Sequence, residues 1–183
     1  MWQLQLPTGS PGKPDTISPA RLKGASGYTN AAYFWTDKND GSMTFWAPEK
    51  GVTTPNSKYA RSELREMNRD GSAADWTLAG NHTLSAQLRV VSVTKNVAVG
   101  QVKLGTGGTS TKPLAELYYR ANGDIYLGTQ NSPDASGQTL HRITNVPLGA
   151  KWTYVKAGSY NQSSSESTTN GAKVKFYSLT VQH

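Results

Sequence analysis

Apolar and polar residues alternate along several short stretches of this chain. In the stretch 82–90, Leu84, Ala86, Leu88 and Val90 would fall on one face of an extended segment. Successive side chains of a strand point to opposite faces, so a period of two indicates strands rather than helices. Comparable stretches, separated by turn residues, recur from one end of the chain to the other. This pattern predicts an all-β fold.

Two hairpins are predicted by short turn signals. An Asp-Gly pair at 40–41 and an Asn-Gly pair at 122–123 favour the tight turns that join antiparallel neighbours. Aromatic residues of the first hairpin are expected in the core, because aromatic clusters in β proteins are mostly buried. The strands to be joined are 33–35 with 43–48, and 114–120 with 124–128.

Further strands are expected near both ends of the chain. Residues 2–7 alternate and stop at a proline, which cannot donate a hydrogen bond to a neighbour, and this is typical of an edge strand. Residues 8–19 are rich in proline and glycine and are expected to form a long loop. A final strand is expected over 174–181.

The stretch 58–67 also alternates, but one of its faces is charged. Arg61, Glu63 and Arg65 would share that face, opposite small and apolar residues. Two guanidinium forks with a carboxylate between them to fix their rotamers suit the binding of carboxylate groups. An exposed strand with cross-strand ion pairs would show the same row, so the row alone leaves both interpretations open.

A second polar face is expected along 97–104. Gln101 and Lys103 would share it, opposite Val102 and Leu104. The glycine that precedes Gln101 would let another group approach the backbone closely. Polar residues in an otherwise apolar strand therefore suggest a site.

A third polar face is expected along 152–162, taken as one strand. Lys156, Tyr160 and Gln162 would point to the same side. Gly158 would leave room for a sugar ring between Lys156 and Tyr160. Three strands with guanidinium, amide, ammonium and phenol groups predict one shared cleft.

Composition limits the choice of partner. The 183 residues are expected to form a single domain, 1–183, and carry a formal charge of +7 with no cysteine. This charge suggests an anionic partner, but the basic residues are scattered, whereas nucleic-acid binding favours clusters or a known module. No stretch is apolar enough to span a membrane. We therefore expect an acidic polysaccharide as partner, with neither nucleic acid nor membrane, and no metal or other cofactor.

The chemistry that suits these groups is β-elimination on a uronic-acid polymer. The proton at C5 is weakly acidic, so the carboxylate must be neutralised, a task for Arg61, Gln101 and Lys103. A tyrosine near cations can then act as base and acid, and Tyr160 is the candidate. Glycoside hydrolysis would instead need two facing carboxyl groups. Glu63, placed between arginines, would stay ionised and could not serve as the acid.

Three segments of the sequence resemble signature segments of the alginate lyases of polysaccharide lyase family 7. The segments are residues 61–66, with the sequence RSELRE, residues 101–103, QVK, and residues 154–162, YVKAGSYNQ. Residues 2–7 and 177–181 are also similar to that family. The resemblance implies a β-jelly-roll sandwich of two antiparallel sheets with a concave substrate cleft, and endolytic cleavage of β-1,4-linked uronate chains.

The resemblance also implies roles for single residues. Arg61 and Gln101 match the pair that neutralises the carboxylate, and Tyr160 matches the catalytic tyrosine. We add Lys103 to the expected catalytic residues as a second cation. The expected substrate-binding residues are Glu63, Arg65, Lys156 and Gln162.

The sequence departs from the family pattern in two places. Lys103 stands where the family has a histidine, the proposed base for guluronate, and His82, His141 and His183 lie outside the three segments. A protonated lysine can neutralise but cannot abstract a proton unless its pKa is strongly lowered. The second departure is length, because only two residues separate Gly149 from the next expected strand at Trp152, where the family usually has about two more strands.

These observations leave three functions open. The leading one is a mannuronate-preferring alginate lyase, with a glucuronan lyase as an alternative. The third is a non-catalytic protein that has the same fold and binds acidic polysaccharides. In that case, Lys103 in place of the histidine would mark the loss of catalysis. We expect a secreted monomer whose export signal is absent from this sequence.

Overall fold

The computed structural model describes residues 1–24, 26–77, 79–104, 113–154 and 158–182. These residues contain one four-residue helix, α1 (Pro19–Leu22), and otherwise strands and loops. The strands are β1 (Trp2–Ser10), β2 (Lys13–Ile17), β3 (Phe34–Thr36), β4 (Met43–Pro48), β5 (Arg61–Glu66), β6 (Thr83–Val93), β7 (Asn96–Val102), β8 (Ala115–Arg120), β9 (Asp124–Thr129), β10 (Thr139–Asn145), β11 (Lys151–Tyr154), β12 (Gly158–Asn161) and β13 (Gly171–Gln182).

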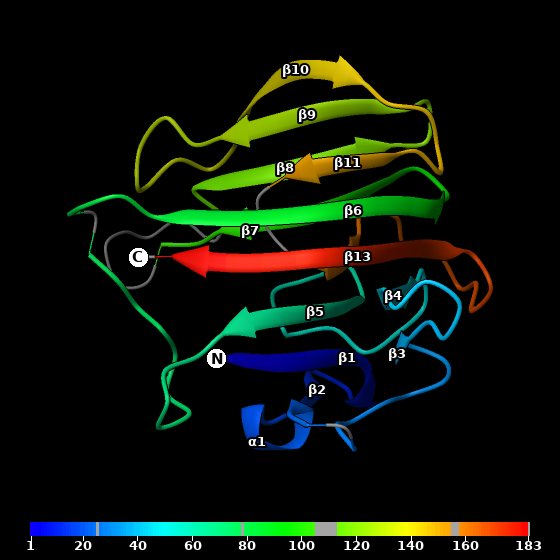
Figure 1. Ribbon diagram of the computed structural model, residues 1–183. Helices are drawn as coiled ribbons and strands as arrows, with labels where there is room; N and C mark the ends of the chain where they lie inside the picture. The colour runs from blue at the N-terminus through cyan, green and yellow to red at the C-terminus, as the bar shows by residue number, and fades with distance from the viewer. Residues whose placement is uncertain (25, 78, 105–112, 155–157, 183) are drawn as a thin grey trace.

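The strands form two antiparallel sheets that lie face to face (Figure 1). The larger sheet has the order β10-β9-β8-β7-β12-β5-β1-β2, and the smaller has the order β11-β6-β13-β4-β3. Contacts of β12 with β13 and β4 join the two sheets near their middle. This arrangement confirms the all-β fold predicted from the alternation and the sandwich of two antiparallel sheets that the family resemblance implies.

The core lies between the sheets and is built from the inward faces of both. Leu4, Val97 and Leu117 of the larger sheet are no more than 1% exposed, as are Leu88 and Phe176 of the smaller sheet. Burial of such side chains contributes roughly 1.5–3 kcal/mol each. Because the inward positions are apolar, the polar residues that alternate with them face outward, and this places the site on an outer sheet face.

The predicted hairpins are confirmed, with one exception in their packing. β3 pairs with β4, and β8 pairs with β9 through the turn at Gly123, whose φ is +88°. Phe34 and Phe45 join the core as expected. Trp35 and Trp46 alternate with them and stay partly exposed, so the expected burial holds for only part of this aromatic cluster.

The edge-strand prediction for residues 2–7 is wrong. β1 pairs with β5 on one side and with β2 on the other, and β2 forms within the segment expected to be a loop. The register between β1 and β2 shifts between Gln5 and Gly9. Pro7 lies within this irregularity, where its missing N–H removes no regular ladder bond.

The prediction of a single strand over 152–162 is also wrong. β11 pairs with β6 in the smaller sheet, whereas β12 lies between β5 and β7 in the larger sheet. Tyr154 and Tyr160 therefore belong to different sheets. The chain also has β10, an edge strand that the alternation did not predict.

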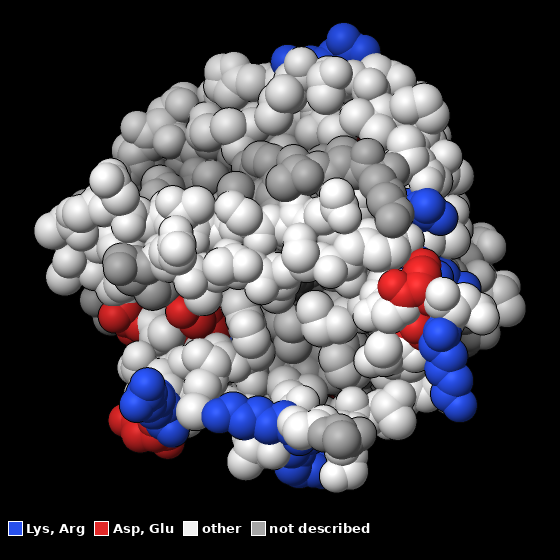
Figure 2. All heavy atoms as spheres, in the orientation of Figure 1, with Lys and Arg blue, Asp and Glu red and all other residues white. Residues whose placement is uncertain are grey.

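Charge is distributed unevenly over the face of the molecule seen in Figure 2. Lysine, arginine and acidic side chains lie mainly toward its lower and right margins, and its centre consists mostly of uncharged residues. The described residues of this face therefore form no broad cationic surface. Among the described residues, no helix reaches the length and apolarity needed to cross a membrane.

Candidate active site

The charged row of β5 lies on the outer face of the larger sheet. Ser62 and Leu64 point inward: the Ser62 hydroxyl donates to the backbone oxygen of Tyr33, and Leu64 packs against the core. Arg61, Glu63 and Arg65 alternate with them and so face outward. The predicted shared face is confirmed.

Tyr160 lies next to Arg61. The two residues are paired across β12 and β5, and the Arg61 Cζ atom lies 3.9 Å from the centre of the Tyr160 ring. Arg61 is only 7% exposed, since the ring covers one side of its guanidinium group. Such a cation–π contact is stronger when water is excluded from it.

Ser57, which precedes β5, connects these two side chains. Its hydroxyl oxygen accepts a hydrogen bond from Arg61 Nη2 at 3.1 Å and lies 3.2 Å from the phenolic oxygen of Tyr160. Tyr59 contacts Tyr160 edge-on, with ring centres 6.2 Å apart. Neither Ser57 nor Tyr59 was selected from the sequence. Ser57 lies in a loop without periodic pattern, and Tyr59, although it belongs to the alternating stretch 58–67, had no role assigned to it.

Glu63 joins β5 to β7. Gln101 Nε2 donates to Glu63 Oε1 at 2.6 Å, and Arg61 Nη1 lies 3.5 Å from Glu63 Oε2. The structure gives no ion pair between Glu63 and Arg65, both of which it describes, and Arg65 is exposed. The carboxylate therefore links Arg61 to Gln101, rather than holding two arginines parallel as the sequence suggested.

Gly158 leaves room for the side chain of Glu63 and not for a sugar ring. It pairs with Glu63 across β12 and β5, and a Cβ atom at this position would lie 3.0 Å from Glu63 Cγ. The space above Gly158 is thus filled by the stem of Glu63. The expectation that it stays open for substrate is wrong.

Lys103 directly follows β7 and carries an exposed side chain. Its pKa is lowered, first by partial desolvation and then by the positive charge of Arg61. Glu63 and Glu116 oppose this shift. Because Lys103 interacts electrostatically with Arg61, Glu63 and Glu116, its ammonium group lies near the site, as expected from its alternation with Gln101.

Two further groups on β8 belong to this surface. Glu116, 4% exposed, is the register partner of Gln101, and the Tyr118 hydroxyl donates to its carboxylate. Burial, followed by the charge of Glu116, raises the pKa of Tyr118. This phenol therefore keeps its proton and is unsuited to act as a base. The alternation of Glu116 and Tyr118 in the sequence could have identified the pair.

Gln5 of β1 was likewise missed. It is the register partner of Glu63, and its amide nitrogen is buried with no hydrogen-bond partner among the described residues. The alternation of residues 2–7 already placed it on a polar face. The alternation therefore identified Gln5 as a polar residue, but it gave no reason to assign this residue a role in the site.

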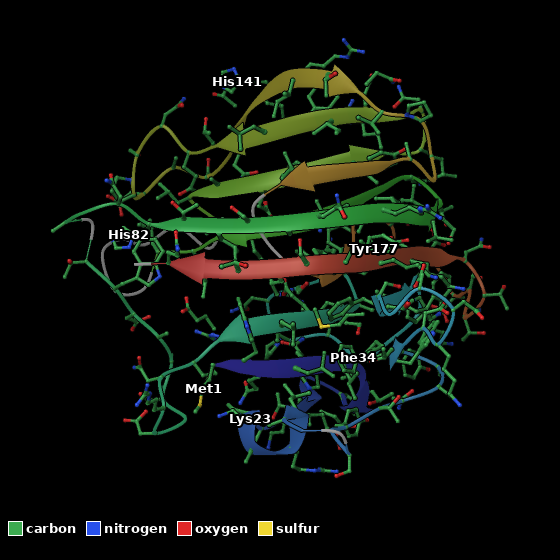
Figure 3. The ribbon with its side chains drawn as sticks, in the orientation of Figure 1. Met1, Lys23, Phe34, His82, His141 and Tyr177 are labelled. Atoms are coloured by element: carbon green, nitrogen blue, oxygen red, sulfur yellow. The ribbon has the colours of Figure 1, made fainter. Side chains whose placement is uncertain are left out.

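Gln162, Lys156 and the histidines complete the set of residues discussed from the sequence. Gln162 follows β12, and its amide nitrogen donates to the backbone oxygen of Tyr160 at 3.4 Å. Lys156 lies outside the described residues, as does His183. His82 and His141 lie apart from each other at the margins of the molecule in Figure 3, and His141 is exposed on β10.

The arrangement has unused capacity for hydrogen bonds. Arg61 Nε and Gln101 Oε1 are buried, and neither has a partner in the described part of the chain. A buried unpaired polar group costs about 1–3 kcal/mol, so a ligand that pairs with it gains affinity. A guanidinium next to a tyrosine hydroxyl could bind a carboxylate while the phenol exchanges a proton. The described residues hold no cluster of three or more His, Cys, Asp or Glu side chains arranged for a metal ion.

Known proteins share both the sequence and the fold of this chain. A sequence model of the alginate lyase family matches residues 1–155. An alginate lyase from Klebsiella pneumoniae is 35% identical over 146 residues, a match that covers 65% of this chain and 47% of that protein. The chain thus matches about half the length of this curated relative.

Solved structures agree over the whole chain. The crystal structure of an alginate lyase from Pseudomonas aeruginosa has a TM-score of 0.85 at 27% identity, covering 100% of this chain and 97% of the other. Alginate lyase A1-II′, described as a member of polysaccharide lyase family 7, has a TM-score of 0.81 at 29% identity, covering 100% and 94%. A variant of A1-II′ was solved in complex with substrate (GGMG), and it has a TM-score of 0.80 at 30% identity, covering 100% and 92%.

These likenesses confirm the jelly-roll fold inferred from the three signature segments. The family match spans the Arg61 row, Gln101 and Lys103, and the structural matches extend it to Tyr160 and the end of the chain. The chain therefore belongs to the alginate lyases of polysaccharide lyase family 7.

Proposed function

We propose that this protein is an endolytic alginate lyase that cleaves the polymer by β-elimination and prefers mannuronate. The observation that carries the proposal is the contact between Arg61 and Tyr160 on an outer sheet face, with Gln101 held nearby through Glu63. One guanidinium, one amide and one phenol are thereby grouped on one surface. This is the set that proton abstraction next to a carboxylate requires.

Arg61, Gln101 and Lys103 would neutralise the uronate carboxylate. Removal of the C5 proton leaves an enolate-like charge on that carboxylate, and preorganised donors stabilise the developing charge most. Arg61 Nε, which has no partner among the described residues, is one available donor. Lys103 would add a second positive charge, provided that it is protonated.

Tyr160 would carry out the proton transfers. Its phenolate takes the C5 proton, the electrons of that bond form the C4=C5 double bond, and the bond from C4 to O4 breaks. The same phenol then returns the proton to the departing O4. Tyr118 could not replace it, because burial and then the charge of the neighbouring Glu116 raise its pKa, so that it keeps its proton.

Other residues would bind the polymer on either side of the cleaved bond. Arg65 is exposed on the same face and could pair with a neighbouring carboxylate. Glu63 would act by orienting Arg61 and Gln101, while Gln162 and Lys156 are proposed to contact substrate. The net charge of +7 favours such an anionic chain. Secretion is proposed because alginate is an extracellular polysaccharide.

The test is incubation of the protein with mannuronan, guluronan and glucuronan separately. Formation of the C4=C5 double bond is followed by ultraviolet absorbance, and product size is followed by chromatography. We expect absorbance to rise fastest with mannuronan, with oligomers of intermediate length appearing early. The proposal fails if none of the three polymers yields an unsaturated product.

A second candidate is a non-catalytic protein that binds acidic polysaccharides. Lys103 favours it, because a cation replaces the histidine that the family resemblance leads one to expect. Binding of all three polymers without any unsaturated product would support this candidate. Because Tyr160 has little use in a protein that only binds, its place beside Arg61 makes the lyase the better proposal.

A further inference from the structure

The hydroxyl of Ser57 makes more polar contacts than a surface serine needs. Its oxygen lies 3.1 Å from Arg61 Nη2 and 3.2 Å from each of three other atoms. These atoms are the backbone nitrogen of Tyr59, the backbone oxygen of Tyr59 and the phenolic oxygen of Tyr160.

The capacity of a hydroxyl group decides how these contacts are used. A serine hydroxyl has one proton to donate and two lone pairs to accept with. Arg61 Nη2 and the Tyr59 backbone N–H can only donate, so they occupy both lone pairs of Ser57. Tyr160 therefore cannot donate to Ser57, and the Ser57 proton goes either to Tyr160 or to the Tyr59 carbonyl.

The protonation state of Tyr160 selects between these two acceptors. Hydrogen bonds to a charged acceptor are roughly twice as strong as those to a neutral one. When Tyr160 is a neutral phenol, its oxygen and the Tyr59 carbonyl are comparable acceptors for Ser57. When Tyr160 has lost its proton, the phenolate is the stronger one.

We propose that Ser57 is a positioning residue that donates a hydrogen bond to the phenolate of Tyr160 while it holds Arg61 against the tyrosine ring. The phenolate is thereby favoured over the phenol. With both lone pairs of Ser57 occupied, the proton of a neutral Tyr160 must point away from Ser57. The inference rests on the proposed proton transfer by Tyr160 and names the group that supports it.

Substitution of Ser57 removes none of the other ionisable groups around Tyr160, although Arg61 loses the hydrogen bond that it donates to Ser57. Arg61 covers its ring from β5, Tyr59 contacts it from the preceding loop, and Tyr118 of β8 lies across Ala98 of β7. The other charged groups that the structure describes on this face are Glu63, Arg65, Lys103 and Glu116.

The first experiment measures the pH dependence of kcat on mannuronan for wild type, Ser57→Ala and Ser57→Thr. If Tyr160 must lose its proton, loss of the donor moves the acid limb of the Ser57→Ala profile upward by about one pH unit. Ser57→Thr keeps a hydroxyl, so its acid limb should lie close to that of wild type. An unchanged acid limb in Ser57→Ala would overturn the proposal.

Ser62→Ala is the matched control. Ser62 lies on β5, is fully buried and also makes a hydrogen bond, but it points inward to Tyr33 and not to the site. This substitution should lower the unfolding temperature without moving the acid limb. An equal shift in Ser62→Ala would mean that the effect of Ser57→Ala is merely structural, and would also overturn the proposal.

A second experiment does not depend on activity. The ultraviolet absorbance of phenolate is titrated in wild type and Tyr160→Phe, and their difference isolates the ionisation of Tyr160. The same difference is measured with Ser57→Ala in both proteins and should appear at higher pH. If no polyuronate is cleaved, the proposed function fails, whereas this titration still decides the role of Ser57. Coinciding difference curves would overturn the inference about Ser57.

Discussion

Gln101 and Glu63 are joined by a 2.6 Å hydrogen bond that crosses an intervening strand. Gln101 lies on β7 and Glu63 on β5, with β12 between them. The bond is possible because Gly158 of β12 has no side chain in the space that the Glu63 stem occupies. A carboxylate acceptor makes the bond charge-assisted, so it fixes the amide of Gln101 as well as the guanidinium of Arg61.

This relationship predicts coupling between substitutions of the two residues. Glu63→Gln and Gln101→Ala should each lower kcat/KM, and the double variant should lose less than the sum of the two free-energy changes. We expect a coupling energy of about 1–2 kcal/mol, typical of a hydrogen bond to a charged group. The measurement is a double-mutant cycle of kcat/KM on mannuronan. Additive losses would show that the two side chains act separately.

Tyr160→Phe should nearly abolish turnover and leave polymer binding almost intact. The substitution removes the proton-transfer group but keeps the ring that lies against Arg61. General acid–base groups contribute about 10²–10⁴-fold in rate, and kcat should fall within that range. Initial rates and equilibrium binding of mannuronan measure the two effects. A variant that retains more than about a tenth of wild-type turnover would contradict the role of Tyr160.

Arg61→Lys should be almost as damaging as Arg61→Ala. Arg61 uses its planar fork in three ways: it covers the Tyr160 ring, donates to Ser57 and approaches Glu63. An ammonium is a compact charge that cannot make these contacts together. The measurement compares kcat/KM of both variants with that of wild type. Near-normal values for Arg61→Lys would mean that Arg61 supplies only its charge.

Alternation predicted the outward face of β5 and most of the core from the sequence alone, because those strands have one buried face. Arg61 and Glu63 could thus be placed together before the structure was known. The position of Tyr160 was harder to predict from the sequence. The alternation over 152–162 continues without interruption, although the chain changes sheets between β11 and β12. No local pattern records that change, because it depends on which distant strands are available to pair.

The contacts that complete the site could not be predicted from local sequence patterns, because they join residues that are far apart in the chain. Ser57 lies in an irregular loop, and its importance comes from a contact with Tyr160, which is 103 residues away. Gln101 likewise reaches Glu63 over 38 residues and across another strand. Periodicity assigns a side chain to a face, but it does not say which strands are neighbours. Sheet order therefore had to be known before these partners could be named.

Lys103 sets a limit on activity at high pH if it neutralises the substrate. Its pKa lies below the ordinary lysine value, because of partial desolvation and then the charge of Arg61. As pH rises, Lys103 therefore loses its charge sooner than a free lysine, and kcat/KM should fall with it. Lys103→Arg keeps the charge and should move this alkaline limb to higher pH. If Lys103 were instead a base, activity would rise as it deprotonates, and Lys103→Arg would be inactive.

Lys103 should also decide which uronate is cleaved. With a protonated lysine in place of a neutral imidazole, the far side of the sugar ring has no base, so Tyr160 must act as base and acid from one side. This geometry suits mannuronate, whose C5 hydrogen and C4 oxygen are syn, and disfavours guluronate, in which they are anti. Glucuronate differs from mannuronate only at C2, so it shares the syn arrangement and does not test the position of the base. Initial rates should be higher on mannuronan than on guluronan, and Lys103→His should gain activity on guluronan. Faster cleavage of guluronan by wild type would instead require Lys103 to lose its proton at working pH, and the alkaline limb of Lys103→Arg would then distinguish the two roles.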